Sequence, residues 1–412
     1  MLERVTDPVR MTVDTTRKCN LSCGYCHSSS GLFYKGPELT GLDIRNIFEG
    51  AEKSKTFDIT LTGGETTLWD GLEETMSASK DLDFPALQLI TNATVLNEKK
   101  LNVLKSGRLK RILVSLDGPQ EIHEKNRGQD TFERTIKGVQ ALRGVVDNIT
   151  VISVIDKTNF DRWPELTSRL IDIGVKQHHL CPVCFSGRAM ELYEGLTEEQ
   201  FGDVRSKVDR IVPTLPNEFK LVFNDILISL PPVRSLPITG FVERYKGWHF
   251  VIRPSGEVDV LVKAWGRSWR ENEMLGNIKY EKLADLINRT KDQREMVVTS
   301  QFERNEELKR KYHFMDPNRI EIEKDKADVQ AVEDGLTEPV YQSLERNKES
   351  NLDNQDYIFL LPLPTAFAEI QKMIQFDPQR YRLRKEKDFG FLFDRETFNL
   401  TLLTNEEINN LL

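Results

Sequence analysis

Five cysteines carry the most specific chemistry in this sequence, and they fall into two groups. Cys19, Cys23 and Cys26 lie within eight residues in the spacing C-x3-C-x2-C, and Cys181 and Cys184 form a second group with the spacing C-x2-C. An odd number of cysteines, three of them crowded together, argues against a disulfide framework in a secreted protein. It favours metal or redox chemistry in a reducing compartment.

The first group of cysteines offers three thiolates where most metal sites need four ligands. A structural zinc site would lack a nearby fourth cysteine, although His27 could complete it. Iron–sulfur clusters are normally held by four cysteine thiolates, so a cluster held by three would keep one iron open to another ligand. The alternatives are a zinc loop and three small buried side chains.

The second group of cysteines allows several interpretations. Cys181-Pro-Val-Cys184 could be a zinc site, a redox pair, half of an auxiliary cluster or two small buried residues at a strand end. If it lies at the carboxyl end of a barrel strand, one thiol could instead face a reaction chamber. Of the neighbouring His178 and His179, strand alternation would point only one inward.

Composition restricts the class of protein. The chain has 412 residues, a formal net charge of −8 and 39% hydrophobic residues, which allows roughly two to three domains of about 150 residues. No apolar run reaches the ~18–20 residues of a membrane span, and the initial MLERVTDPVR lacks the apolar core of a secretory signal. We therefore expect a cytoplasmic protein that binds neither membrane nor, given its acidity, nucleic acid.

Six strand-like runs alternate with helical patterns over the first half of the chain. The runs span residues 11–14, 57–61, 86–91, 111–116, 149–155 and 175–180. Such alternation predicts β/α units and a parallel sheet, whose carboxyl ends share one edge where functional side chains gather. The first cysteine group follows the first run, so we expect it on a loop that leaves a strand.

The segment CNLSCGYC, residues 19–26, resembles the cluster-binding signature of the radical S-adenosylmethionine (radical SAM) superfamily. The resemblance implies an α/β fold, a partial (β/α)6 TIM-type barrel, with an α+β C-terminal extension. It also implies one 4Fe-4S cluster on Cys19, Cys23 and Cys26. S-adenosylmethionine would chelate the open iron through its amino and carboxylate groups.

Further motifs of this superfamily stand at the predicted strand ends. Gly63-Gly64-Glu65-Thr66 resembles the GGE motif that holds the cofactor's amino group, with threonine where proline is commoner. Glycines allow a close backbone approach, and a carboxylate suits an ammonium group. The complete set expected at the cofactor is Tyr25, Gly63, Gly64, Glu65, Thr66, Asn92, Ser115, Asp117, Arg127, Ile152 and Val154.

Four of these residues are assigned through the peptide-modifying branch of the superfamily and the superfamily's strand pattern. A serine like Ser115, and an arginine twelve residues later like Arg127, contact the cofactor's carboxylate and ribose in that branch. Arginine suits a carboxylate because its fork donates two parallel bonds. The alternating apolar residues Ile152 and Val154 lie on a strand that matches the one flanking the adenine in the superfamily.

The second half of the chain resembles two modules of the same branch. We expect a radical SAM core over residues 1–215, a SPASM-like region over 216–290, a charged helical segment and linker over 291–355, and a partial winged-helix module over 356–412. The SPASM-like region keeps WHFVIRPSGEV and LGNI, but no cysteine follows Cys184, so it is expected to hold no auxiliary cluster. The last module resembles the start of a RiPP recognition element, which binds the leader of a ribosomally made precursor peptide, and a second chain could complete it.

The resemblance implies an enzyme that cleaves S-adenosylmethionine reductively and uses the 5'-deoxyadenosyl radical to abstract hydrogen from a precursor peptide. Epimerisation, crosslinking or oxidation could follow, and Cys184 or Cys181 could return a hydrogen atom to the substrate. A flavodoxin or ferredoxin would supply the electron. The alternatives are a radical SAM enzyme acting on a small-molecule cofactor or nucleotide precursor, and a non-catalytic metal- or peptide-binding partner.

Overall fold

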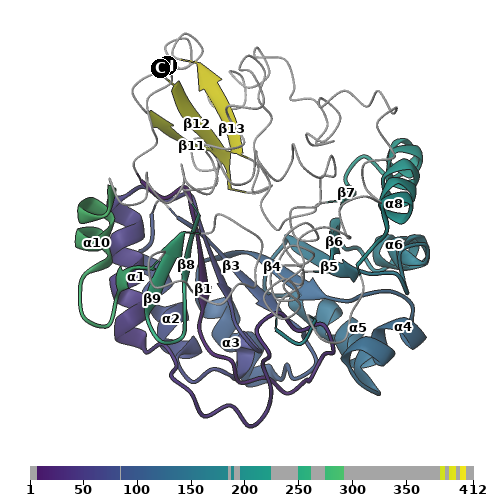
Figure 1. Cartoon of the computed structure of the whole chain (residues 1–412), viewed down its shortest axis with the longest axis horizontal. Helices are drawn as coiled ribbons and strands as arrows, with labels where there is room; N and C mark the ends of the chain where they lie inside the picture. The colour runs from purple at the N-terminus through teal and green to yellow at the C-terminus, as the bar shows by residue number, and fades with distance from the viewer. Residues whose placement is uncertain are drawn as a thin grey trace, which may run out of the picture.

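The computed structural model describes residues 7–83, 85–183, 187–189, 195–223, 249–260, 274–291, 381–385, 389–395 and 400–404. Within these residues, ten strands form one sheet in the order β10-β9-β8-β1-β2-β3-β4-β5-β6-β7, and three more form a second sheet (Figure 1). The large sheet is mostly parallel and carries helices between its strands. The expected α/β fold class is therefore confirmed.

The first seven strands of the chain pair in parallel, each with the next, in the large sheet. They are β1 (Arg10–Asp14), β2 (Asp58–Thr62), β3 (Ala86–Thr91), β4 (Leu109–Ser115), β5 (Ile149–Ile155), β6 (Gln177–Pro182) and β7 (Lys220–Phe223). The first six coincide with the six predicted runs, with ends displaced by no more than two residues. The seventh strand was not predicted.

Helices connect these strands and cover the outer face of the sheet. They are α1 (Gly41–Lys53), α2 (Leu72–Ala78), α3 (Glu98–Ser106), α4 (Gln120–Arg127), α5 (Thr131–Leu142), α6 (Trp163–Asp172) and α8 (Glu198–Ile211), with short 3-10 helices η1 (Thr66–Leu68), η2 (Ser79–Asp81) and η3 (Val212–Thr214). Helix α1 begins at a capping box, in which Thr40 and Asp43 each bond to the other's main-chain N–H. Among the described residues, no helix has both the length and the apolar character needed to cross a membrane.

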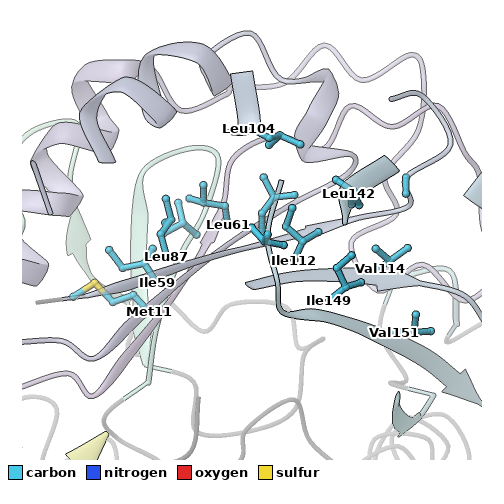
Figure 2. Packing of buried hydrophobic residues seen from close by; sticks show 14 of the residues in the cluster. Met11, Ile59, Leu61, Leu87, Leu104, Ile112, Val114, Leu142, Ile149 and Val151 are labelled. Carbon is cyan, nitrogen blue, oxygen red and sulfur yellow. The ribbon is translucent and has the colours of Figure 1, made fainter. Parts of the chain in front are cut away.

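Alternate residues of the parallel strands build the core between sheet and helices. Met11, Ile59, Leu61, Ile112 and Val114 are fully buried there (Figure 2). Their regular alternation is the period of two that strands impose on side-chain direction. The residues between them must therefore point to the opposite face, into the interior of the partial barrel.

The interior near the amino ends of the strands is polar. Arg10 forms an ion pair with Asp58 at 3.0 Å, and Gln88 donates to Asp58 at 3.2 Å. Arg111 donates through Nε to the side-chain oxygen of Gln88 at 2.8 Å. These buried groups satisfy one another across β1, β2, β3 and β4, as buried charges require.

Three described strands of residues 216–290, the region predicted to be SPASM-like, extend the large sheet beyond β1. Strand β8 (His249–Ile252) pairs parallel with β1, β9 (Glu257–Val260) pairs antiparallel with β8, and β10 (Met274–Asn277) pairs antiparallel with β9. Helix α10 (Leu283–Arg289) lies against α1, where Leu283 donates its main-chain N–H to Asn46 at 2.9 Å. The described part of this region is thus hydrogen-bonded to the barrel, and the domain boundaries stay predictions.

The C-terminal strands form an antiparallel sheet of β11 (Tyr381–Lys385), β12 (Phe389–Asp394) and β13 (Leu400–Thr404), shown in yellow in Figure 1. Phe57, just before β2, stacks on Phe393 with ring centroids 5.4 Å apart. Arg384 donates to the main-chain oxygens of Pro8 at 3.0 Å and Ser54 at 3.3 Å. This sheet therefore packs at the amino ends of the barrel strands. Residues 292–380 lie outside the described residues.

We expect Phe57 to anchor this packing. Phe57→Ala should lower the free energy of unfolding by about 3–5 kcal/mol, because it removes a fully buried ring between the barrel and the C-terminal sheet. Phe33→Ala, at a side chain that is 88% exposed, is the matched control and should change it by less than about 0.5 kcal/mol. Urea titration measures both, and equal losses would contradict the packing described here.

Candidate cofactor site

The three cysteines of the first group gather at the carboxyl edge of the sheet. Cys19 and Cys23 are buried, at 8% and 9% exposure, and Cys26 is half-buried. They pack with Val183 and Ala189, which follow β6. The loop after β1 that carries these three cysteines, the cysteine loop, therefore reaches across the mouth of the partial barrel to the end of β6.

The surroundings of these thiols determine how they could bind metal. Burial raises the pKa of Cys19 to about 12 and also raises that of Cys23. Main-chain N–H groups nevertheless point at two sulfurs, from Leu21 to Cys19 and from Ser30 to Cys26, both at 3.4 Å. Iron would displace the thiol protons and bind the thiolates, so these residues fit a metal cluster.

The geometry distinguishes a single ion from a cluster. Among the described residues, no three His, Cys, Asp or Glu side chains form a group that could hold one metal ion. A tetrahedral zinc ion at ~2.3 Å from each sulfur would need thiolates about 4 Å apart. A cluster places its own iron and sulfide ions between the thiolates, so it binds thiolates that stand further apart than those around a single ion.

Gly63 and Gly64 bring the end of β2 against the cysteine loop. Gly64 donates its main-chain N–H to Thr16 at 2.6 Å, and Glu65 donates to Lys18 at 2.9 Å. A Cβ atom on Gly63 would lie 2.3 Å from the Thr16 oxygen, and Gly63 also has a φ of 144°. Only glycine fits such an approach, so both positions are required for the shape of this loop.

Glu65 is fully buried and ties β2 to β3. Its Oε1 accepts from the hydroxyls of Thr67 and Thr91, both at 2.6 Å, and its Oε2 accepts from the main-chain N–H of Asn92 at 2.7 Å. Together with the Thr67 N–H, these bonds fill most of the carboxylate's acceptor sites. Thr66 is buried as well, and its hydroxyl has no hydrogen-bond partner among the described residues.

Asn92 connects the end of β3 to the cysteine loop. Its amide nitrogen donates to the side-chain oxygen of Asn20 at 3.0 Å, next to Cys19. Its own oxygen accepts from the N–H and the hydroxyl of Thr94. The predicted cofactor residues on β2 and β3 are thus brought together around Cys19.

Asp117, Arg127 and Tyr25 form a buried triad at the end of β4. Arg127 donates through Nε at 2.8 Å and through Nη2 at 3.0 Å to the two oxygens of Asp117, and the Tyr25 hydroxyl also donates to Asp117. The arginine charge is the chief stabilising influence that keeps the pKa of Asp117 below its ordinary value despite burial, which acts to raise it. Two donors of the Arg127 fork are therefore engaged by the protein itself. Ser115, two residues before Asp117 in the chain, is half-buried.

The apolar wall of the site comes from β5 and β6. Ile152 packs with Leu113 and Cys181 inside the barrel, and Val154 packs against the cysteine loop. Cys181 thus faces the interior, close to two residues expected at the cofactor. Cys184 lies outside the described residues.

The two histidines of β6 point in opposite directions. His178 lies between Ser153, at 2.7 Å, and Thr167, at 2.9 Å, under helix α6. His179 pairs in register with Ile152, so it faces the interior. Burial lowers the pKa of both to about 3, which keeps them neutral.

Two residues at this edge, Arg188 and Asp14, were not expected. Arg188 donates through Nε to the main-chain oxygen of Cys23 at 2.8 Å and through Nη2 to that of Ser30 at 3.0 Å. Asp14 is buried at the end of β1, 3.8 Å from Arg253. Neither lies in a motif, and the only sequence signal was the glycine before Arg188.

We expect Asp117 and Arg127 to be strongly coupled. Asp117→Asn should lower the free energy of unfolding by about 3–5 kcal/mol, because it leaves the Arg127 charge buried without its carboxylate. Adding Arg127→Met should then cost much less than Arg127→Met alone. The exposed pair Arg169 and Glu133, 3.0 Å apart, is the control and should couple by less than about 1 kcal/mol. Additive losses at the buried pair would refute the coupling.

His178 makes stability depend on pH. The unfolded chain gains a proton on this histidine below pH 6.5, whereas folded His178 gains one only near pH 3. Its contribution is therefore complete above pH 6.5 and falls with decreasing pH, by up to about 1.4 kcal/mol per pH unit. His178→Gln should reduce this slope in urea titrations between pH 7 and pH 5. An unchanged slope would show that folding does not lower the pKa of His178.

The sequence of this chain is similar to those of known proteins. Residues 13–170 match the family model described as the radical SAM superfamily. The sporulation killing factor maturation protein SkfB of Bacillus subtilis strain 168 is 25% identical over 190 residues, which are 46% of each chain. A probable GTP 3',8-cyclase of Methanothermobacter marburgensis is 29% identical over 220 residues, 48% of this chain and 72% of that protein.

Solved structures share the fold. Streptococcus suis SuiB, determined with S-adenosylmethionine and with precursor peptide SuiA, aligns with a TM-score of 0.56 and 16% identity over 68% of this chain and 65% of SuiB. The match to SkfB spans less than half of that protein's length. The family implies S-adenosylmethionine and an iron–sulfur cluster, and the cysteine loop has the donors for one. Residues 13–170 of this chain therefore form a domain of the radical SAM superfamily.

Proposed function

We propose that this protein is a radical SAM enzyme that acts on a precursor peptide. The observation that carries the proposal is the convergence of three cysteine thiols, two of them buried, with the ends of β2, β3 and β4 at one edge of the sheet. In the proposed site, Cys19, Cys23 and Cys26 are the ligands of one 4Fe-4S cluster. S-adenosylmethionine binds at the iron that they leave open.

When bound, this cluster and S-adenosylmethionine supply one-electron cleavage to methionine and a 5'-deoxyadenosyl radical, which takes a hydrogen atom from the substrate. The chain's own residues hold the reactants and exclude water. Thiolates supply negative charge to the iron, and the packing of Val183 and Ala189 over the cysteine loop keeps the site dry. A flavodoxin or ferredoxin is the proposed reductant.

The cofactor would be held by groups that still have capacity to bond. Arg127 uses Nε and Nη2 on Asp117, so its Nη1 donors can bind the cofactor's carboxylate. Glu65 retains acceptor capacity on Oε2 for the ammonium group, and the Thr66 hydroxyl lies next to it in the chain. Asn92 and Ser115 complete the polar wall.

The opposite wall of the proposed site is apolar. Ile152 and Val154 would flank the adenine, because they stand on the interior face of β5. Cys181 packs against Ile152 and is the described candidate for returning a hydrogen atom to a substrate radical. Such a return would favour epimerisation over chemistry that needs an auxiliary cluster. Cys184 remains a second candidate.

A peptide substrate is supported by the relatives. SuiB has been solved with a precursor peptide, and SkfB is named as a maturation protein for a killing factor. We place the proposed enzyme in the cytoplasm, with a leader peptide, and with a second chain if the C-terminal module is incomplete. Peptide binding is to be tested on the full chain, because the C-terminal sheet packs against Phe57 of the barrel.

The similarity to a GTP 3',8-cyclase favours a nucleotide or another small molecule as the alternative substrate. The two candidates are separated by mass spectrometry after incubation with S-adenosylmethionine and reductant. Peptides encoded beside the gene form one arm, and GTP forms the other. Conversion of GTP with unmodified peptides would overturn the peptide proposal.

Anaerobic reconstitution tests the enzyme class. The full chain should take up about four irons and form 5'-deoxyadenosine from S-adenosylmethionine and a reductant. Replacing Cys19, Cys23 and Cys26 together by alanine should abolish both signals. Cys181→Ala should leave the iron content unchanged and serves as the matched control.

Two results would count against the proposal. A wild-type protein that binds iron but forms no 5'-deoxyadenosine would favour the non-catalytic alternative, a metal- or peptide-binding partner. Full iron uptake by the triple alanine variant would place the metal elsewhere in the chain.

A further inference from the structure

Residues 187–189, which follow β6, form hydrogen bonds to the cysteine loop. Three hydrogen bonds run from Arg188 to main-chain oxygens of this loop: from Nε to Cys23 at 2.8 Å, from Nη2 to Ser30 at 3.0 Å, and from its own N–H to Cys26 at 3.1 Å. These oxygens span the two cysteines that follow Cys19. One residue, about 160 positions further along the chain, therefore fixes both ends of this stretch.

Gly187 allows the segment after β6 to lie this close to the cysteine loop. It has a φ of 55°, and a Cβ atom on it would lie 2.5 Å from the main-chain oxygens of both Cys26 and His27. Such a distance excludes every residue with a side chain unless the backbone moves. Ala189, the next residue but one, is fully buried among the cysteines. The segment thus lies directly on the loop.

The charge of Arg188 is placed differently from that of the other nearby arginine. Arg127 is paired with the Asp117 carboxylate, whereas both side-chain bonds of Arg188 end on uncharged carbonyl oxygens. Among the described residues no carboxylate is paired with Arg188, which is half-buried. A positive charge without such a partner stabilises added negative charge nearby. The net charge and hydrogen bonds around an iron–sulfur cluster are known to set its reduction potential.

We propose that Arg188 is a positioning residue for the cluster, with two separable effects. Its fork holds the loop in the shape that retains the cluster, and its charge raises the cluster's reduction potential. This inference rests on the proposed cluster at Cys19, Cys23 and Cys26. The segment after β6 thereby influences how readily the cluster accepts an electron from the external reductant.

Three substitutions separate the two effects. Arg188→Lys keeps the charge but cannot donate in a fork, so the potential should stay at the wild-type value while iron is lost to a chelator about tenfold faster or more. Arg188→Gln keeps a donor but removes the charge, so the midpoint potential should become more negative. Arg188→Ala should show both changes. Arg169→Gln, at an exposed ion pair on α6, is the control and should change neither.

The measurements are an anaerobic redox titration followed by electron paramagnetic resonance, and the rate of iron release from the full chain. A wild-type potential in Arg188→Gln, or a wild-type rate of iron release in Arg188→Lys, would overturn the inference. Circular dichroism checks folding, and if Arg188→Ala does not fold, the other two variants decide. A wild-type protein without any cluster would instead refute the proposed function.

Discussion

The whole site depends on how closely the ends of β1 and β2 approach each other. The main-chain N–H of Gly64 lies 2.6 Å from the Thr16 oxygen, and a side chain at either glycine would collide with the loop that begins there. This contact sets the direction in which the loop leaves β1. It thereby places Cys19 beside Asn20 and Asn92, and brings Glu65 into hydrogen bonds with β3.

The two ends of the barrel differ in the residues that lie there. The carboxyl end gathers thiols, the buried Asp117 triad and the apolar wall of β5 and β6. The amino end is closed by packing, because Phe57 and Arg384 join it to the C-terminal sheet. Between them, Arg10, Asp58 and Arg111 are buried in a network that fixes neighbouring strands to one another. Rigid strands are what a site needs to hold reactive groups in place.

Much of this architecture could be predicted from the sequence because it is local. The six strand runs and the helices between them have regular periods, and the cysteine and GGE motifs have fixed spacings. A parallel sheet then necessarily brings the motifs to one edge. The placement of residues such as Asn92 at that edge follows from the end of a strand alone.

Other features arise from pairings between distant residues, which have no periodic signal. The bond from Arg188 to Cys23 joins positions 165 apart, and the pairing of β8 with β1 brings His249 next to Arg10. The sequence also could not show that Arg127 binds Asp117 with two of its donors, because the arginine alone is equally suited to a ligand's carboxylate. The direction of His178, away from the interior, depended on the exact register of β6.

The central claim is that three thiolates hold a cluster whose remaining iron binds S-adenosylmethionine. Electron paramagnetic resonance of the reduced, reconstituted protein tests it most directly, with and without S-adenosylmethionine. Binding at an open iron changes the ligands of the cluster, so we expect the spectrum to shift when S-adenosylmethionine is added. A cluster signal that is identical in both samples would contradict it.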